Sequence, residues 1–336
     1  MPPPPPPAGS GPGAGPATAP RRFVLGDPGL PGAFARPAVT VGVFDGVHLG
    51  HQALLAHLVA WATEANVDPV VVTFDVHPRT VLRGEGPALI TTLEHRLGLL
   101  GRCGVRGVVV LPFDRAMASW TAEEFAQRVF VDALGASRVL VGKNHRFGKD
   151  RGGDFALLSE LGRRHGFEAR EVELEVMDDV ISSTAIRERI AAGDLTGASE
   201  LLGRPVSVLG RVVEGDRRGR QLGFPTANLD LRGSARPPRG VYAARARVTG
   251  DPLALGVPQV PAVVNVGRRP TFKPEGELDL VEVHLLEPPA EELYGRWLEV
   301  SFVARLRDER RFAGPAELVA QINKDIADAR RLLATP

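Results

Sequence analysis

Several features that mark specialised classes of protein are absent from this sequence. It has a single cysteine, Cys103, among 336 residues, so a disulfide framework and a multi-cysteine zinc site are both excluded. We interpret Cys103 as a small, partly buried apolar residue, and this cysteine usage is compatible with the reducing cytoplasm. No stretch of about 18 apolar residues occurs, so no transmembrane helix is expected. The net charge is +1, without a run of five like charges, so neither nucleic acid nor a membrane is expected as a partner.

The first 20 residues are rich in proline and glycine. They have neither the basic start nor the apolar core of a secretory signal, and proline and glycine prevent the amphipathic helix of a transit peptide. Residues 1–20 are therefore predicted to form a disordered, polyproline-like tail. The rest of the chain, of ordinary composition, is long enough for two domains.

The first part of the chain alternates short apolar segments with segments of helical periodicity. This alternation predicts an α/β fold, with a parallel sheet covered by helices on both faces. The expected strands are 38–43, 70–74, 107–111, 138–141 and 171–176. The expected helices are 52–65, 92–100 and 155–165, and a capping box at 121–124 opens another. Ligands bind such sheets beyond the carboxyl ends of the strands, which is where the segment around His48 follows the first strand.

The second part has a different period. Two short helices are expected at 183–192 and 195–202, ended by Gly193 and Gly203. Strands follow without intervening helices, which predicts an antiparallel sheet or small barrel, and a C-terminal helix is expected at 316–333. These strands are 206–213, 240–248, 261–266, 279–286 and 297–305. The domain boundary is placed near residues 203–205.

The segment 42–51 has the features of a phosphate-binding loop. Gly46 and Gly50 allow the backbone to approach a ligand, and the helix that begins near Gly50 offers free N–H groups and a positive dipole end. His48 and His51 are three residues apart, so both rings can face one way. This arrangement suits transfer of AMP from ATP to another phosphate, which depends on alignment and charge stabilisation and needs no strong base. A metal-binding histidine pair and a chance surface pair are the alternatives, while the P-loop motif is absent.

A second phosphate cradle is predicted at the start of the helix at 183–192. Ser182 or Ser183 can cap this helix, and Arg187 lies about one turn further on. Hydroxyl groups and a guanidinium at a helix start can bind phosphate, although such a serine–threonine segment on its own is more often a simple cap.

The second half contains residues that suit phosphoryl transfer. Glycines at 215, 219 and 223 can fold their N–H groups around phosphate, although such a segment can also be a plain turn. Thr226 and Asn228 are two apart and point the same way on an extended strand, where their oxygens suit Mg²⁺. Glu282 shares one face of its strand with His284, and a carboxylate there can serve as a base, or the face can simply be solvated.

The chain resembles the bacterial bifunctional riboflavin kinase/FMN adenylyltransferases, also called FAD synthetases, from about residue 38 to 332. The motifs that carry the resemblance, in chain order, are VGVFDGVHLGHQALL (41–55), TFDVHP (73–78), VGKNHRFG (141–148), ISSTAIRERIAAGDL (181–195), LLGRP (201–205), GRQLGFPTANL (219–229), NVGRRPTF (265–272), VEVHLL (281–286) and LYGRWLEVSFVARLRDERRF (293–312). The first motif is shared with other nucleotidyltransferases, whereas GFPTAN is much more specific to riboflavin kinases.

The resemblance implies a Rossmann-like α/β nucleotidyltransferase domain at 21–203 and a small antiparallel β-barrel kinase domain with a C-terminal helix at 204–336. It implies a cytoplasmic transferase that makes FMN from riboflavin and FAD from FMN. The implied ligands are riboflavin, FMN, FAD and ATP or ADP, with ATP as co-substrate and Mg²⁺ as cofactor. The implied catalytic residues are His48, His51, Arg187 and Glu282. The implied nucleotide-binding residues are Gly42, Phe44, Asp45, Gly50, Asn144, Ser183, Thr184, Gly215, Gly219, Gly223, Thr226 and Asn228, of which Thr226 and Asn228 also hold the metal.

Three positions in the first domain differ from the usual family pattern. Val76 stands where proline is usual, His145 stands where an aromatic residue is usual, and Lys143 stands where an acid or small polar residue is commoner. Val76 and His145 leave open a riboflavin kinase with a weakened adenylyltransferase domain. A flavin-binding regulator without turnover is a second alternative, although such a protein would not need Glu282. The sequence makes no prediction about the oligomeric state.

Overall fold

The computed structural model describes residues 19–173, 181–215, 219, 222–231, 234–254, 257–268 and 279–334. The predicted tail thus lies outside the described residues, except for its last two positions. Positions 174–176 of the strand expected at 171–176 also lie outside them.

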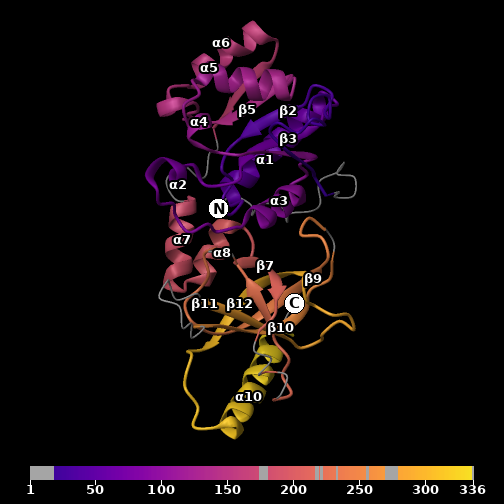
Figure 1. Cartoon of the computed structure of the whole chain (residues 1–336), viewed down its shortest axis with the longest axis vertical. Coiled ribbons are helices and arrows are strands. Elements are labelled where there is room, and N and C mark those ends of the chain that lie inside the picture. The colour runs from indigo at the N-terminus through magenta and orange to yellow at the C-terminus, as the bar shows by residue number, and fades with distance from the viewer. Residues whose placement is uncertain are drawn as a thin grey trace, which may run out of the picture. The chain divides into compact units, whose positions relative to one another are not determined.

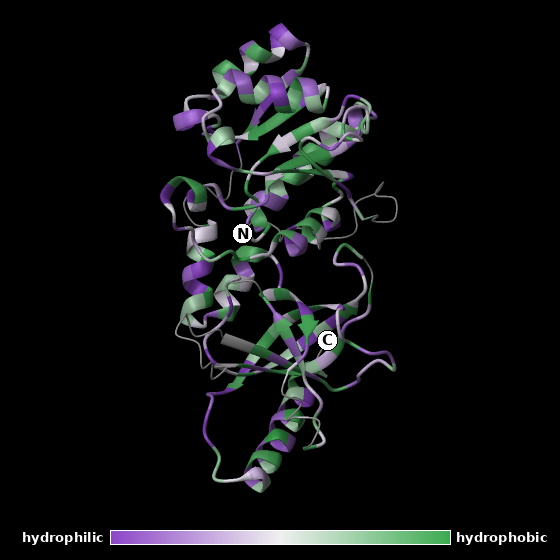
Figure 2. Cartoon of the chain, viewed as in Figure 1, coloured by the Kyte–Doolittle hydropathy of each residue, from purple (hydrophilic) through white to green (hydrophobic). Residues whose placement is uncertain are grey.

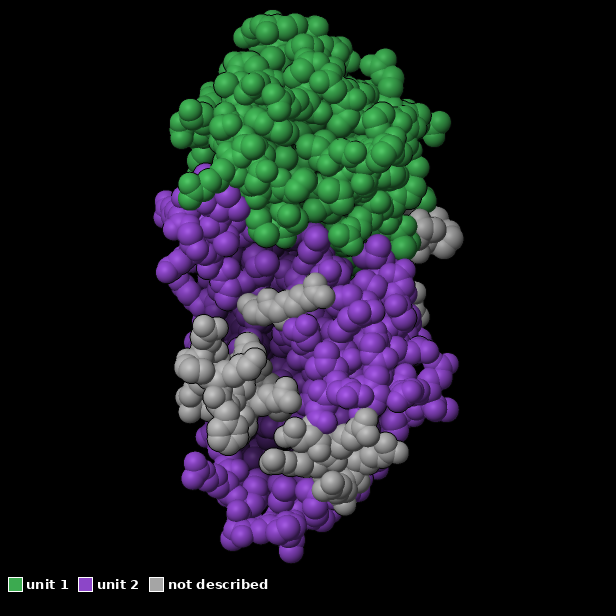
Figure 3. Space-filling model, viewed as in Figure 1, with its two compact units in different colours: residues 1–43, 52–76, 97–173 green, residues 44–51, 77–96, 174–336 purple. Residues whose placement is uncertain are grey.

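The chain divides into two compact units, which Figure 3 shows in two colours. Unit 1 comprises residues 1–43, 52–76 and 97–173, and unit 2 comprises residues 44–51, 77–96 and 174–336. The loop 44–51 and the segment 77–96 therefore group with the second half of the chain, although each follows a strand of the first half. The domain boundary near residues 203–205 stays a prediction.

Unit 1 contains the parallel sheet expected from the sequence, with the strand order β1-β4-β3-β2-β5-β6. Its strands are β1 (Arg21–Val24), β2 (Ala38–Val41), β3 (Pro69–Phe74), β4 (Gly107–Leu111), β5 (Arg138–Gly142) and β6 (Glu168–Val172). The central strands β3 and β4 are valine runs buried almost throughout, because a parallel sheet is covered on both faces. Figure 2 shows these strands as mainly hydrophobic.

Helices follow most strands of this half (Figure 1). They are α1 (Leu49–Glu64), α2 (Pro78–Arg83), α3 (Leu93–Arg102), α4 (Arg115–Ala118), α5 (Ala122–Phe125), the π-helix η1 (Ala126–Ala133), the 3₁₀-helix η2 (Lys149–Arg151) and α6 (Phe155–His165). The predicted capping box is confirmed, since Thr121 accepts from the Glu124 N–H and Glu124 accepts from the Thr121 N–H.

Unit 2 contains a closed barrel with the strand order β10-β11-β8-β7-β12-β9, in which all neighbours are antiparallel. Its strands are β7 (Ser207–Val213), β8 (Ala227–Asp230), β9 (Gly240–Thr249), β10 (Val260–Arg268), β11 (Asp279–Leu285) and β12 (Trp297–Arg307). The fold class predicted from the sequence, a parallel α/β sheet followed by a small barrel, is confirmed.

Among the described residues, the helices that pack against the barrel include α7 (Ser183–Ala192), α8 (Leu195–Leu202) and α10 (Pro315–Leu333). Helices α7 and α8 have the predicted bounds, and Gly193 and Gly203 end them in the left-handed conformation that glycine adopts without strain. Both helices share one hydrophobic core with Ile90 and the barrel strands. Ala329 and Leu333 of α10 pack against Val241 and Val263 of the barrel.

Candidate functional site

The topology of the parallel sheet defines one place for a ligand. Strand β2 lies between β3 and β5, and the strand order continues from β3 to β4 and β1 on one side and from β5 to β6 on the other. The connections that leave β2 and β5 therefore diverge, and ligands bind at such a point. Gly42 directly follows β2, and Asn144 lies two residues beyond β5, so both belong to this edge of unit 1.

The loop 44–51 has a strained backbone. Phe44 and Val47 adopt positive φ angles of 52° and 41°, which are uncommon for residues other than glycine. Gly46 has φ 83°, and a Cβ at this position would lie 3.0 Å from the side chain of Ile90. Such a conformation persists only where neighbouring groups hold it, and strain of this kind concentrates at functional sites.

Asp45 supplies most of the contacts that hold this loop. Its side chain is 2% exposed, and its two oxygens accept from the backbone N–H groups of Ile90 and Thr91 at 3.1 and 3.0 Å. The Arg187 guanidinium donates to the same carboxylate at 3.0 Å. The Thr91 hydroxyl lies 3.3 Å from it and accepts from the Gly46 N–H at 3.0 Å. In this structure Asp45 and Arg187 therefore organise the loop together.

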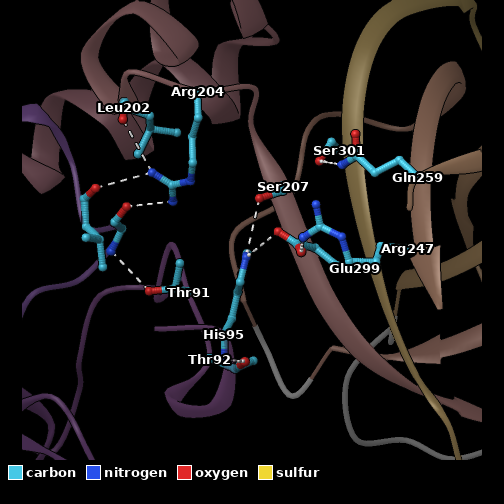
Figure 4. Close-up of polar contacts among 12 residues, drawn as sticks. Thr91, Thr92, His95, Leu202, Arg204, Ser207, Arg247, Gln259, Glu299 and Ser301 are labelled. Atoms are coloured by element: carbon cyan, nitrogen blue, oxygen red, sulfur yellow. Dashed lines mark hydrogen bonds and ion pairs between the residues drawn. The ribbon is translucent and has the colours of Figure 1, made fainter. Parts of the chain in front are cut away.

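Two further side chains, which lie more than 130 residues later in the sequence, donate hydrogen bonds to the backbone of the loop. The Ser183 hydroxyl donates to the Asp45 carbonyl at 2.9 Å. Arg204 donates to the Gly46 carbonyl at 2.7 Å and to the Val47 carbonyl at 3.3 Å. Figure 4 shows the same guanidinium beside Leu202, to whose carbonyl it donates at 3.4 Å. Ser182, not Ser183, caps α7, and its hydroxyl accepts from the Ala185 N–H. Ser183 is thereby left to contact the loop, while Thr184 is exposed.

The rings of His48 and His51 are stacked, with centroids 3.6 Å apart and planes 20° from parallel. Phe44 packs edge-on against His51 at 5.1 Å. Both histidines lie at the start of α1, where Gly50 is the second residue of the helix. The expectation that the rings face one way is confirmed.

Both histidines are neutral near pH 7. Burial lowers the pKa of His48 to about 4, with Asp45 opposing this change and Arg204 adding to it. Burial also lowers the pKa of His51 well below its usual value, and His48, Arg96 and Arg204 act in the same direction. The backbone N–H of His51 lies 3.4 Å from His48 Nδ1, which favours the tautomer of His48 that carries its proton on Nε2. His51 Nδ1 is buried and has no hydrogen-bond partner among the described residues.

The loop after β5 belongs to unit 1. Asn144 has φ 62°, a left-handed conformation that asparagine tolerates. Burial lowers the pKa of His145 to about 4, and the positive charge of Arg151 adds to this effect. The His145 ring stacks at 6.2 Å from Phe147, and its Nε2 has no partner within the described part of the chain. The departure at this position thus introduces a neutral imidazole.

The barrel carries a second group of polar residues on three adjacent strands. Glu282 on β11 lies in register with Asn228 on β8 and with Asn265 on β10. The Asn265 amide donates to the Glu282 carboxylate at 3.4 Å. As predicted, Val281, Val283 and Leu285 are buried in the barrel while Glu282 and His284 share the other face. His284 Nδ1 donates to the Pro225 carbonyl at 2.8 Å, so this strand face contacts the GFPTAN segment.

Thr226 and Asn228 both lie against glycines of the preceding loop. A Cβ on Gly215 would lie 2.0 Å from Asn228 Nδ2, and one on Gly219 would lie 3.2 Å from Thr226 Oγ1. Thr226 is exposed just before β8, whereas Asn228 is 9% exposed within it. Gly223 has φ 86° in the turn that leads to this strand. Residues 216–218, 220 and 221 of the loop lie outside the described residues.

Four residues that contribute to these sites are missing from the sequence-based predictions: Thr91, Arg96, Arg204 and Asn265. Arg96 is 1% exposed, an unusual degree of burial for arginine, and its charge lowers the pKa of His51. Arg204 and Asn265 lie in motifs that the resemblance includes, so only their roles were missing. Thr91 has no distinguishing signal in the sequence, since a threonine before a helix is ordinarily a cap.

No group of three or more histidine, cysteine, aspartate or glutamate side chains that could hold a metal ion occurs in the described ranges. Within the same residues, no helix combines the length and apolar character needed to cross a bilayer.

A histidine pair at a helix start and a barrel carboxylate beside amide side chains are the kinds of groups that an enzyme transferring phosphate-containing groups requires. Two family models match the chain: FAD synthetase over residues 33–185 and riboflavin kinase over residues 202–333. Together with the relatives described next, they establish that the chain belongs to the bifunctional riboflavin kinase/FMN adenylyltransferase family. The resemblance inferred from the motifs is confirmed.

Curated relatives named bifunctional riboflavin kinase/FMN adenylyltransferase match over most of their length. The protein of Escherichia coli strain K12 is 41% identical over 87% of this chain and 91% of its own. The proteins of Pseudomonas fluorescens and Haemophilus influenzae are 40% and 38% identical, with 92% and 93% of their lengths covered. A solved structure described as a macrolide-efflux protein from Streptococcus pneumoniae has a TM-score of 0.73 and 31% identity, and the match covers 92% of this chain and 98% of that one.

Proposed function

We propose that this chain catalyses two successive reactions in the cytoplasm. In the first, riboflavin and ATP give FMN and ADP. In the second, FMN and a further ATP give FAD and pyrophosphate. One observation supports this proposal best. The chain matches both family models, and it contains both groups of polar residues, one around the loop 44–51 and one on the barrel strands β8 and β11.

For adenylyl transfer, we propose that the loop 44–51 binds the phosphates of ATP. A phosphate oxygen of FMN attacks the α-phosphorus, the bond from this phosphorus to the oxygen bridging the α- and β-phosphates breaks, and pyrophosphate leaves. The attacking oxygen is already an anion, so no base is needed, and charge stabilisation is the main requirement. Neutral His48 and His51 would supply N–H donors at the start of α1, where the helix dipole also favours negative charge.

Arg187 is proposed to add positive charge to this site, and Thr184 to contact the nucleotide. For Gly42 and Asn144 of unit 1, a nucleotide-binding role is proposed from the family resemblance alone. Arg187 is bound to Asp45 in this structure, but its Nε has no partner among the described residues and remains available to a phosphate. The buried, unpartnered Nδ1 of His51 supports the proposal in the same way, because a buried polar atom costs free energy until a ligand pairs with it.

For the kinase reaction, we propose that Glu282 is the general base. The riboflavin 5′-hydroxyl is a neutral nucleophile, so removal of its proton as the bond to the γ-phosphorus forms lowers the barrier. The γ-phosphoryl group passes to the hydroxyl oxygen, and ADP leaves. The Asn265 amide, 3.4 Å from Glu282, would orient the carboxylate. Gly215, Gly219 and Gly223 are proposed to bring backbone N–H groups to the phosphates.

Mg²⁺ is proposed as the cofactor of the kinase site, held by Thr226 and Asn228. A hydroxyl and an amide oxygen are the hard donors that Mg²⁺ prefers, and exposed Thr226 leaves room for the waters and phosphates that complete its shell. The glycines against both side chains leave space that any Cβ would fill, which fits this interpretation. When bound, the ion would neutralise charge on the phosphates of ATP.

One assay tests the proposal. The purified chain is incubated with riboflavin, ATP and Mg²⁺, and FMN and FAD are separated by chromatography. Both products are expected. FMN alone would leave a kinase with an inactive adenylyltransferase domain, and neither product would leave a flavin-binding protein without turnover.

Two variants test the assignment of the residues. His48→Ala should abolish formation of FAD while FMN still accumulates. Glu282→Gln should abolish formation of FMN, while FAD still forms when FMN is supplied. Unchanged kinase turnover in Glu282→Gln would show that Glu282 is not the base.

A further inference from the structure

A buried polar cluster joins the start of α3 to the barrel. His95 Nε2 lies 3.3 Å from Glu299 Oε1 and 3.4 Å from the Ser207 hydroxyl, and Arg247 donates to Glu299 Oε2 at 2.7 Å. Figure 4 shows the four side chains converging, with His95 in the first turn of α3 and the others on barrel strands. The side chains of His95 and Glu299 are 3% and 6% exposed. The cluster, named here the His95 cluster, comprises His95, Ser207, Arg247 and Glu299.

The barrel fixes its half of the His95 cluster rigidly. Glu299 on β12 lies directly opposite Arg247 on β9 in the strand register, and Ser207 lies on β7, the other neighbour of β12. Arg247 is held a second time, because its Nε donates to the Val257 carbonyl at 2.8 Å. The Glu299 carboxylate is therefore presented to His95 in one orientation.

The segment 90–96 connects the His95 cluster to the loop 44–51. The backbone N–H of His95 donates to the Thr92 hydroxyl at 3.2 Å, which fixes the first turn of α3. Thr91 then donates its N–H to Asp45 and accepts the N–H of Gly46. The next residue of α3, Arg96, is buried and acts electrostatically on His51. The segment 90–96 thus contacts the loop with one side and the barrel with the other.

Stability alone does not account for such a cluster. Buried ion pairs are often no more stabilising than aliphatic side chains of the same volume, because both charges lose their hydration. Hydrogen bonds between polar groups hold the contacting side chains in a single orientation, which apolar packing alone does not. Since Ile90, two residues before Thr92, already packs in the hydrophobic core shared with the barrel, burial is supplied without the His95 cluster.

We propose that the His95 cluster positions the loop 44–51 for adenylyl transfer, with His95 and Glu299 acting as positioning residues. The barrel that carries the kinase residues is then also a support for the ATP-binding loop of the other reaction. This inference rests on the proposed function, since it concerns the rate of FAD formation from FMN and ATP. Glu282 and Asn228 lie on β11 and β8, and neither strand pairs with β12, which carries Glu299, so the kinase reaction should not depend on the His95 cluster.

Replacement of His95 by leucine tests the proposal. His95→Leu keeps the volume but removes the hydrogen bond to Glu299, and should lower kcat for FAD formation about tenfold, with the KM for FMN changed less than about twofold. His95→Gln can still offer an N–H to Glu299 and should restore most of the lost rate. Glu299→Gln, which keeps the shape and loses the charge, should lower the same kcat. The double variant His95→Leu/Glu299→Gln should be no worse than the poorer single variant.

Asp325→Asn is the matched control. Asp325 is a buried carboxylate on α10 that pairs at 2.8 Å with Arg307 of β12, the strand that also carries Glu299. Its other described hydrogen-bond partner is Gln321 of α10. It should lower thermal stability without a selective loss of FAD formation. Formation of FMN from riboflavin in each sample reports that the barrel is folded.

The outcomes distinguish failure of the proposed function from failure of the proposed positioning role. If the unaltered chain makes no FAD, the proposed function fails. If it makes FAD, and folded His95→Leu and Glu299→Gln make FAD equally fast, the positioning role alone is refuted. Equal losses of both activities in His95→Leu, Glu299→Gln and Asp325→Asn would also refute it, because they indicate a general structural effect.

Discussion

The Asp45 carboxylate offers the sharpest test of how the ATP-binding loop is held. It accepts from two buried backbone N–H groups, those of Ile90 and Thr91, and from the Arg187 guanidinium. Asp45→Asn keeps one oxygen but replaces the other with an N–H₂ group, so at least one donor loses its acceptor and the guanidinium loses its charged partner. Hydrogen bonds to charged groups contribute about 1.5–3 kcal/mol each. We therefore expect the loop conformation to lose about 3 kcal/mol, which corresponds to about a hundredfold in rate.

The assay for this prediction is steady-state formation of FAD from FMN at ATP concentrations below KM, with formation of FMN from riboflavin measured on the same preparation. Adenylyl transfer should fall about a hundredfold in Asp45→Asn. Kinase activity should stay within about twofold, because none of the kinase residues contacts Asp45 in any described interaction. Asp325→Asn again controls for loss of a buried carboxylate that has an arginine partner. Asp45→Asn with a rate within threefold of the unaltered chain would refute the reasoning.

Two further predictions concern the other site and the effect of pH. Gly215→Ala would place a methyl group 2.0 Å from Asn228 Nδ2, so kinase kcat/KM should fall at least about tenfold. FAD formation from supplied FMN should stay unchanged. An active kinase would show that the loop does not pack on Asn228. The pKa of His48 is about 4 in the folded chain and 6.5 in its ordinary state. Its neutral, buried form therefore contributes stability that is complete above pH 6.5 and is lost as the pH falls towards 4, by about 3 kcal/mol in total. Urea unfolding at pH 7 and pH 5 should show about 2 kcal/mol of this loss, and His48→Gln should reduce it. An equal loss in the variant would refute the assignment to His48.

The sequence predicts most accurately those helices whose start and end are both marked by capping residues. Helices α7 and α8 have the expected bounds because a serine or aspartate caps the start and a glycine in the left-handed conformation ends each one. The alternation in β11 correctly separates its buried valines from Glu282. By contrast, β8 was not predicted as a strand, since its four residues Ala227–Asp230 contain no β-branched or aromatic residue. It becomes a strand because β7 and β11 pair with it on both sides.

The short strand β1 and the helices α2 and α4 are also missing from the predictions. Four to six residues are too few for a periodicity to stand out, and β1 is defined by its pairing with β4 across more than 80 residues of chain. The bounds of β6 differ by three residues at its start, since β6 follows the register of β5 more than its own apolar pattern.

The sequence by itself determined the family, the order of the two folds and the identity of the histidine pair in the loop 44–51, because these depend on residue types at fixed spacing along the chain. Only the tertiary structure decided how that loop is held and in what state its histidines are. Thr91, Arg204 and Asp45 meet through space across more than 150 residues of sequence, and the burial that keeps His48 and His51 neutral is a property of the packed chain. Long-range contacts and desolvation depend on which residues the fold brings together, so the spacing of residues along the chain does not reveal them.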